Sequence, residues 1–503
     1  MKKLFFILTL FSCAFANEKS TTLYKTLNPT SISKHLAFYE LYPDTKEGKD
    51  ALKTAFALLQ GDLSCKSDFN FPKVDIGSLI QIVNKTPSHT PNIKEEDLAL
   101  IEKLSSKLKN RSKKTHLSWN EEDFINAAPD DIDLTRGLFI AEMGTSEESR
   151  KKIRYYEASV DLLSLQILAN LPKNPTNLDK IKAINDFIFF EMGFRYPPLS
   201  NYAKEIDSYS FLPSVIDKRK GICLGTSILY LCIADRLDLP LQAVTPPGHI
   251  FVRYKDKNGE IFNIETTARG INIPSEDYLS IETRDLQIRN NKEVIGLAFI
   301  NEASMHLKEK GFEKAASLYE KAQKYLPQDF LIKQLLGCCY LFIHKEKEGK
   351  KLLKEVENYV SPYLVSNDNL ASDFLSKKID IEGLKATFTP HEDNRESILA
   401  KKNELENILK KYPNFRMGLM QLANTWLQLG RTKEAGSILT EYYKKDPLDP
   451  TVNYYLSVIS YERFDYKNAW KYLKETEKIL KNVNYYPKVL KDFRSSLMRS
   501  CLE

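Results

Sequence analysis

The stretch that decides the fold is KGICLGTS, residues 220–227. A glycine stands two positions before Cys223, and an apolar run, ILYLCIA, follows at residues 228–234. This order is typical of a buried helix entered through a glycine-containing turn, with Cys223 in the first turn. The N-terminus of a helix carries a partial positive charge and unpaired backbone N–H groups, and both stabilise a thiolate. Cys223 is therefore a candidate nucleophile.

Two expected strands follow the cysteine helix. His249 comes after the segment PPG and opens the first strand, IFVRY at residues 250–254, and the second strand is IFNIE at residues 261–265. A cysteine, then a histidine, then an acid or amide is the order of a thiol nucleophile, its base and the group that orients the base. The second strand is expected to supply the third member.

The turn DKNGE, residues 256–260, decides which side chain of the second strand lies beside His249. A three-residue loop with Gly259 left-handed forms a G1 bulge and places Glu265 opposite Phe251. Glu265 is then the diagonal neighbour of His249, roughly 7–8 Å away. A two-residue Asn-Gly turn would instead turn Glu265 to the other face of the sheet.

Each of these residues also has a structural explanation. A cysteine on an apolar helix is more often a small buried hydrophobic residue, and Cys232 is explained in that way. A histidine at the start of a strand is more often structural than catalytic. Only the combination of Cys223, His249 and Glu265 favours a catalytic site.

Three segments resemble the transglutaminase-like superfamily, namely residues 216–224 with residues 238–240, PGHIFVR at 247–253 and IETTARG at 264–270. The resemblance is narrower to the SirB-one N-terminal branch, whose members often carry tetratricopeptide repeats (TPR). It covers roughly residues 120–285 and includes the segment MGFRY at residues 192–196.

The resemblance implies a papain-like α+β core with Cys223 as nucleophile and His249 as base. Glu265 stands where the family usually has aspartate, and the longer carboxylate can still orient an imidazole. The implied chemistry is hydrolysis of an amide or peptide bond, or acyl transfer, through a thioester. Some members of the branch lack the cysteine, so a non-catalytic domain is the alternative.

Helices are expected before the core, and another helical region after it. Apolar spacing predicts helices at residues 147–171 and 180–192, so that the α+β domain spans residues 120–290. From residue 291 to 503 the pattern is wholly helical. Three pairs of residues there are separated by 34 positions, which is the tetratricopeptide period: Leu422 and Leu456, Ala435 and Ala469, Leu439 and Leu473.

Earlier copies of this repeat are expected near residues 299–327 and, in degenerate form, near 335–340, with residues 359–395 out of register. The repeat predicts a TPR solenoid that binds a protein or peptide partner. Adjacent Cys338 and Cys339 lie inside an expected helix, where packing explains them better than chemistry.

The first 16 residues have the pattern of a secretory signal peptide. Lys2 and Lys3 are followed by a short apolar run and by the small-x-small site Ala14-Phe15-Ala16. Cleavage there predicts an exported protein, periplasmic or secreted, of bacterial type. The segment LFSC loosely resembles a lipobox, so lipidation of Cys13 and envelope anchoring form an alternative. Residues 17–119 are expected to be a helical region with a linker at residues 84–92.

Composition excludes several classes of function. The formal net charge is +6, from 73 basic and 67 acidic residues, and the basic residues form no cluster with aromatics, which argues against nucleic acid as a partner. The 7 cysteines and 7 histidines have no metal-ligand spacing, so neither a metal nor a cofactor is expected. No later stretch is long and apolar enough to span a membrane.

Two functions follow from these observations. One is a thiol amidase, protease or acyl transferase whose solenoid recruits a protein substrate. The other is a non-catalytic TPR scaffold that retains a transglutaminase-like fold. Cys223, His249 and Glu265 distinguish them, because only the first function needs their chemistry.

Overall fold

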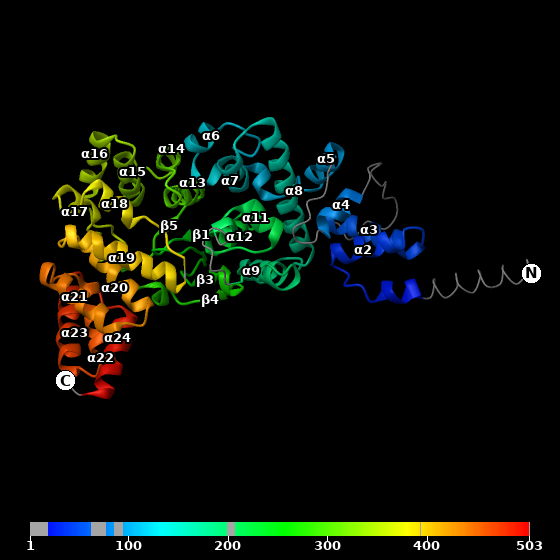
Figure 1. Cartoon of the computed structure of the whole chain (residues 1–503). Helices are drawn as coiled ribbons and strands as arrows, with labels where there is room; N and C mark the ends of the chain where they lie inside the picture. Colours follow the sequence, from blue (N-terminus) through cyan, green and yellow to red (C-terminus); the bar gives the residue numbers. More distant parts are fainter. Residues whose placement is uncertain (1–18, 62–76, 85–93, 199–206, 393, 502–503) are drawn as a thin grey trace, which may run out of the picture. The chain divides into compact units, whose positions relative to one another are not determined.

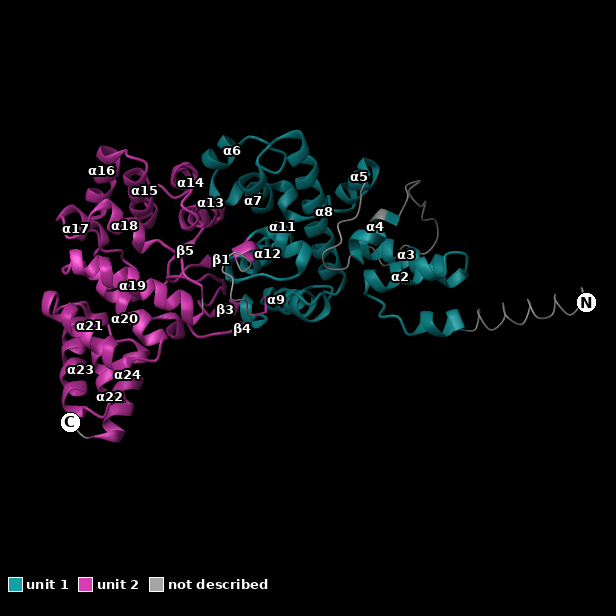
Figure 2. Cartoon of the chain, viewed as in Figure 1, with its two compact units in different colours: residues 1–196, 211–241, 266–270 teal, residues 197–210, 242–265, 271–503 magenta. Residues whose placement is uncertain are grey.

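The structure is a computed structural model of the 503-residue chain that describes residues 19–61, 77–84, 94–198, 207–392 and 394–501 (Figure 1). The predicted signal peptide, Cys13, Cys65 and all but the first residue of the predicted linker lie outside these residues. The chain forms two compact units (Figure 2). Unit 1 holds residues 1–196, 211–241 and 266–270, and unit 2 holds residues 197–210, 242–265 and 271–503.

Unit 1 is helical. Its main helices are α2 (Ile32–Leu41), α3 (Lys46–Gln60), α4 (Gly77–Val83), α5 (Glu95–Leu104), α6 (Glu121–Asn126), α7 (Leu134–Met143), α8 (Glu147–Ala169), α9 (Asn177–Asn185), α11 (Leu212–Lys218) and α12 (Cys223–Arg236). Helices α2 to α5 form one apolar cluster with α8, whose Leu162 and Leu165 are buried in it. The N-terminal helical region is therefore packed on the same helix, α8, that also contacts α12.

The helices expected around the core are present with small shifts. The predicted helix 147–171 is α8, and the predicted helix 180–192 begins earlier, at Asn177, because Thr176 and Asp179 form a capping box. From Asp186 to Glu191 the helix continues as a π-helix, η3. No local pattern in the sequence distinguishes this π-helical turn from an α-helix.

Unit 2 carries a five-stranded sheet of order β4-β3-β2-β1-β5. Its strands are β1 (Leu241–Val244), β2 (Phe251–Lys255), β3 (Ile261–Glu265), β4 (Ile271–Asn272) and β5 (Ile288–Arg289). The pairs β1–β5, β2–β3 and β3–β4 are antiparallel. The sequence predicted β2 and β3, whereas the other three strands are too short for a recognisable alternation.

The register of the β2–β3 hairpin confirms the three-residue loop. Arg253 is paired with Asn263, the Asp256 N–H donates to the Glu260 carbonyl oxygen at 2.9 Å, and Gly259 has φ +90°. A side chain at this φ would be strained, so glycine selects the loop. The two-residue alternative is wrong, and Glu265 faces the same side of the sheet as His249.

The rest of unit 2 is a series of helices, most of which pack in pairs with a neighbour in the chain. They are α13 (Asn291–Lys308) with α14 (Phe312–Tyr325), α15 (Phe330–Phe342) with α16 (Glu346–Val356), α19 (Arg395–Lys411), α20 (Arg416–Gln428) with α21 (Thr432–Lys445), α22 (Pro450–Glu462) with α23 (Tyr466–Lys481), and α24 (Lys488–Ser500). The pair α22–α23 begins 34 residues after α20–α21, since Arg416 and Pro450 open the first helices.

The residues of the 34-residue repeat pack between these helices. Ala435, Ala469 and Leu473 are 0 % exposed, and Leu439 is 1 % exposed. The predicted TPR-like organisation of this region is thereby confirmed. The out-of-register segment holds two short helices, α17 (Leu370–Leu375) and α18 (Ile381–Thr387), instead of a full-length pair.

Candidate functional site

His249 is positioned by the turn that leads into β2. Its backbone N–H donates to the Pro246 carbonyl oxygen at 3.1 Å, and Gly248 has φ +72°. Only glycine adopts this left-handed conformation without strain. The PPGH segment is therefore a tight turn that places His249 directly before β2.

Glu265, the last residue of β3, accepts a hydrogen bond from His249. The two atoms, Nε2 of His249 and Oε2 of Glu265, are 2.8 Å apart, and the side chains are 28 % and 6 % exposed. An ionised carboxylate can only accept, so Nε2 carries the hydrogen and the lone pair of a neutral ring lies on Nδ1. The predicted neighbours His249 and Glu265 are thus in contact.

Tyr278 is a third member of this cluster that the sequence analysis missed. Its hydroxyl donates to Oε2 of Glu265 at 2.8 Å. Its ring stacks on the imidazole of His249, with ring centroids 6.0 Å apart, and on Phe251, with centroids 4.0 Å apart. Burial and the hydrogen bond to Glu265 raise the pKa of Tyr278, so the phenol stays protonated and remains a donor.

A second set of polar contacts holds β2 to β3 on the same face. Nε of Arg253 donates to Oδ1 of Asn263 at 2.8 Å, and Nη2 donates to the hydroxyl of Ser275 at 3.1 Å. The Asn263 amide also donates to Ser275 at 3.0 Å. These contacts fix the start of η6 (Ser275–Tyr278), the 3-10 turn that carries Tyr278.

Cys223 belongs to unit 1 and is the first residue of α12, as predicted. Its helix has no side-chain cap at Ile222, and the thiol is partly exposed. A Cβ at Gly221 would lie 2.4 Å from the hydroxyl of Thr226, so this entry to the helix requires glycine. Cys223 therefore stands at the N-terminal end of α12, where the first backbone N–H groups have no acceptor within the helix.

Three other cysteines in the described part of the chain are buried, unlike Cys223. Cys232, Cys338 and Cys339 are 0 % exposed. Burial raises the pKa of Cys232 and of Cys339 to about 12. Packing is thus the role of all three residues, in agreement with the sequence analysis.

One hydrogen bond within unit 1 links the cysteine helix to the residue that follows Glu265. The hydroxyl of Ser227, one turn after Cys223, lies 2.9 Å from that of Thr266, and both residues are buried. Thr266 begins η5 (Thr266–Ala268), which contacts α12. Within unit 1, η5 is therefore tied to α12.

The region that holds these residues matches a known family. Residues 154–294 match the transglutaminase-like superfamily. The matched stretch contains Cys223, His249 and Glu265, and it includes Tyr278. The transglutaminase-like domain is thus confirmed, while the narrower branch stays a prediction. No curated protein is significantly similar to the chain.

Solved structures are similar to part of the chain. A crystal structure of MamA is 14 % identical over 37 % of this chain and 97 % of its own, with a TM-score of 0.20. YrrB, described as a TPR protein with an unusual peptide-binding site, is 16 % identical over 40 % of this chain and 92 % of its own, with a TM-score of 0.21.

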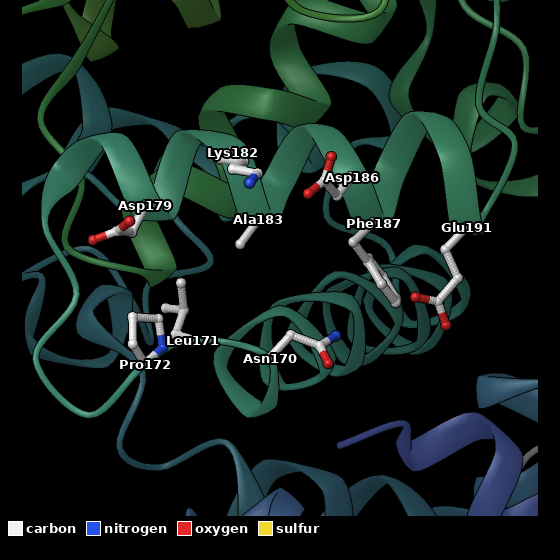
Figure 3. Close-up of a pocket in the computed structure, with 9 residues that line it drawn as sticks. All are labelled: Asn170, Leu171, Pro172, Asp179, Lys182, Ala183, Asp186, Phe187 and Glu191. Atoms are coloured by element: carbon white, nitrogen blue, oxygen red, sulfur yellow. The ribbon is translucent and has the colours of Figure 1, made fainter. Parts of the chain in front are cut away.

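The transglutaminase-like domain also has an open cavity of about 370 Å³ beside α9 and η3, lined in part by Asn170, Asp179, Asp186, Phe187 and Glu191 (Figure 3). Asp179 is engaged in the capping box with Thr176. None of the predicted site residues lines this cavity, and we assign no site to it.

Within the described ranges, no group of His, Cys, Asp and Glu could hold a metal ion. None of the helices described is long and apolar enough to cross a membrane.

Because Asp235 on the cysteine helix has a raised pKa, we predict that the free energy of unfolding of unit 1 depends on pH. Burial, with a smaller contribution from Asp133, raises the pKa of Asp235 to about 6, although Lys113 lies 3.4 Å away. A raised carboxyl pKa stabilises the protonated form, so this contribution is present below pH 4 and is lost as pH rises through 6. We expect Asp235→Asn to raise the free energy of unfolding at pH 7 by about 1–3 kcal/mol.

The measurement is urea denaturation between pH 4 and pH 7. In the Asp235→Asn variant, the stability of unit 1 should fall less between pH 4 and pH 6 than in the parent. The control is Asp238→Asn, the same change three residues later, where the side chain is 71 % exposed. Equal pH dependence in all three proteins would contradict the prediction.

Proposed function

We propose that the chain is an exported thiol enzyme that hydrolyses amide or peptide bonds, or transfers the acyl group to an amine. Cys223 is the nucleophile, His249 the base, and Glu265 the group that orients the base. The observation that carries this proposal is the His249–Glu265 hydrogen bond, formed in the register that the hairpin loop selects. The partly exposed thiol of Cys223 at the start of α12 supports it.

The proposed reaction uses both nitrogens of His249. Nδ1 takes the proton from the thiol, while Nε2 keeps its hydrogen bond to Glu265. The thiolate adds to the carbonyl carbon, the C–N bond breaks, and Nδ1 returns the proton to the leaving amine. The resulting thioester is cleaved by water, which gives an acid, or by a second amine, which gives a new amide. The backbone N–H of Cys223 is a candidate donor to the oxyanion.

The helical part of unit 2 supplies the proposed route to a substrate. Consecutive TPR-like pairs present several helices side by side, which is a surface suited to an extended peptide or protein partner. Export rests on the pattern of the first 16 residues, with the Cys13 lipid anchor as the alternative. Periplasmic or extracellular proteins would then be the substrates or partners.

Alkylation of thiols tests the proposal without a known substrate. With iodoacetamide at pH 7, Cys223 should react at least ~100-fold faster than Cys232, because a thiol with a pKa of about 12 is almost wholly protonated at that pH. The matched control is Cys501, which is also partly exposed but stands at the C-terminal end of α24. We expect Cys223 to react about tenfold faster than Cys501, since only the N-terminal end of a helix favours the thiolate.

A His249→Ala variant separates the two functions. An isolated thiol is only a few per cent ionised at pH 7, so loss of the imidazole should lower the rate at Cys223 about tenfold. Peptide mapping by mass spectrometry measures each cysteine separately. If Cys223 and Cys501 react alike and His249→Ala changes neither rate, the thiol site is wrong and the non-catalytic TPR scaffold is the better function.

A further inference from the structure

The segment between β4 and β5 connects the His249–Glu265 pair to the C-terminal helices. We call residues 275–285 the arm. It begins at η6, carries Tyr278, and continues to the loop before β5. All of its contacts described below lie within unit 2.

At its first end, the arm holds the two site residues through Tyr278. The Tyr278 hydroxyl and Nε2 of His249 share one acceptor atom, Oε2 of Glu265, at 2.8 Å each. The ring planes of Tyr278 and His249 are within 16° of parallel. Tyr278 therefore constrains the rotation of the carboxylate and packs on one face of the imidazole.

Along its length, the arm is anchored by residues more than 200 positions away in the chain. The hydroxyl of Tyr485 lies 2.9 Å from the Ser280 carbonyl oxygen and 2.7 Å from that of Thr283. Nζ of Lys488, the first residue of α24, donates to Asp277 at 2.6 Å. Asp277 directly precedes Tyr278, so this ion pair acts one residue from the site.

Apolar contacts and backbone bonds complete the anchor. Ile281 is 4 % exposed and belongs to the same cluster as Trp470, Leu473 and Leu490 from the C-terminal helices. In addition, the Val365 N–H donates to the Glu282 carbonyl oxygen at 2.8 Å. The arm is thus fixed by hydrogen bonds, an ion pair and buried apolar contact together.

We propose that Tyr278 is a positioning residue for His249, and that α24 and the residues before it hold Tyr278 in place through the arm. The inference rests on the proposed function, in which His249 is the base. It assigns the C-terminal helices a second role beside partner binding. A partner that moves Tyr485 or Lys488 changes the orientation of the imidazole, so occupancy of the C-terminal helices regulates the site.

The titration of His249, followed by NMR of histidine labelled at the ring carbon and assigned with His249→Gln, tests this inference. In Tyr278→Phe the ring and its stacking remain, but Glu265 loses one donor. The carboxylate then pairs more strongly with the imidazolium, so we expect the titration to move upward by about half a pH unit. The matched control is Tyr486→Phe, which removes a similar tyrosine–carboxylate bond, to Glu477 at 2.9 Å.

Two further variants test the anchor. Tyr485→Phe and Lys488→Met should move the His249 titration in the same direction by a smaller amount, whereas Lys491→Met, at an exposed lysine of the same helix, should not. An unchanged titration in Tyr278→Phe would overturn the role of Tyr278. A change in Tyr278→Phe with none in Tyr485→Phe or Lys488→Met would overturn the regulation through the arm.

This measurement is independent of the thiol. If Cys223 is no more reactive than Cys501 but the His249 titration responds to Tyr278→Phe and Lys488→Met, the proposed catalysis fails while the arm stands. If Cys223 is reactive and none of the arm variants moves the titration, the catalytic proposal stands and the arm is only structural.

Discussion

Replacing Arg236 with methionine is expected to lower the free energy of unfolding of unit 1 by about 3–5 kcal/mol. Arg236 ends the cysteine helix, and its guanidinium is 1 % exposed. Nε donates to Oδ1 of Asp161 at 2.6 Å, and Nη1 donates to the Cys232 carbonyl oxygen at 3.1 Å and to the hydroxyl of Thr135. Asp161 also pairs with Arg111.

The cost comes from the charges that Arg236 leaves behind. Asp161 is 1 % exposed and Asp133 is 0 % exposed, and the electrostatic effect of Arg236 acts on both carboxylates. A buried carboxylate that loses one of its cations keeps a desolvation penalty that a methionine side chain cannot offset. The effect is therefore much larger than the loss of a surface ion pair.

Tryptophan fluorescence during urea denaturation measures this change. Of the three tryptophans, Trp119 lies in unit 1, and Trp426 and Trp470 lie in unit 2. In a parent protein with Trp426 and Trp470 both changed to phenylalanine, the fluorescence reports the unfolding of unit 1 alone. The control is Arg154→Met, since Arg154 pairs with Glu102 at 2.8 Å but is 24 % exposed. We expect that variant to lose at most about 1 kcal/mol. Equal losses in the two variants would contradict the argument.

The parts of the site that the sequence predicts depend on the local conformation of a few glycines. Gly248 and Gly259 adopt left-handed conformations that other residues rarely adopt, and Gly221 leaves the space that Thr226 occupies. The helix start, the PPGH turn and the hairpin register therefore follow from a few neighbouring residues. The register in turn determines that Glu265 contacts His249. The predicted register and the predicted contact between His249 and Glu265 depend only on residues that are close together in the sequence.

The parts that the sequence analysis missed depend on contacts between distant segments. Tyr278 lies on a single 3-10 turn with no periodic pattern, and its position depends on an arm anchored by Tyr485 and Lys488. Strands β4 and β5 have two residues each, and neighbouring strands make them recognisable. The Arg236–Asp161 pair joins two helices whose separate patterns give no sign of a buried charge.

Replacing Glu265 with alanine is expected to lower the rate of acyl transfer or hydrolysis by about 10²–10⁴. The change removes the acceptor for Nε2 of His249 and the acceptor for the Tyr278 hydroxyl at once. The imidazole is then free to rotate, and the neutral tautomer with its lone pair on Nδ1 is no longer favoured. Only that tautomer, in that orientation, can take the proton of Cys223 in the proposed reaction.

Two probes measure the rate: incorporation of a dansylated alkylamine into casein for transfer, and cleavage of a mixed tryptic peptide pool for hydrolysis. Cys223→Ala gives the background, because it removes the nucleophile and should abolish turnover. Glu265→Ala at the wild-type rate, with Cys223→Ala inactive, would show that the His249–Glu265 pair is structural. Wild-type activity no higher than that of Cys223→Ala with both probes would favour the scaffold.

Glu265→Gln separates orientation from charge. A glutamine oxygen can still accept the Nε2 hydrogen bond, so the ring keeps its tautomer and position, but the amide does not stabilise an imidazolium. If orientation dominates, the glutamine variant should keep a rate well above that of Glu265→Ala. If the negative charge dominates, its rate should fall as far as that of Glu265→Ala. A large gap between the glutamine and alanine variants would therefore mean that the hydrogen bond that orients the imidazole is what makes His249 a competent base.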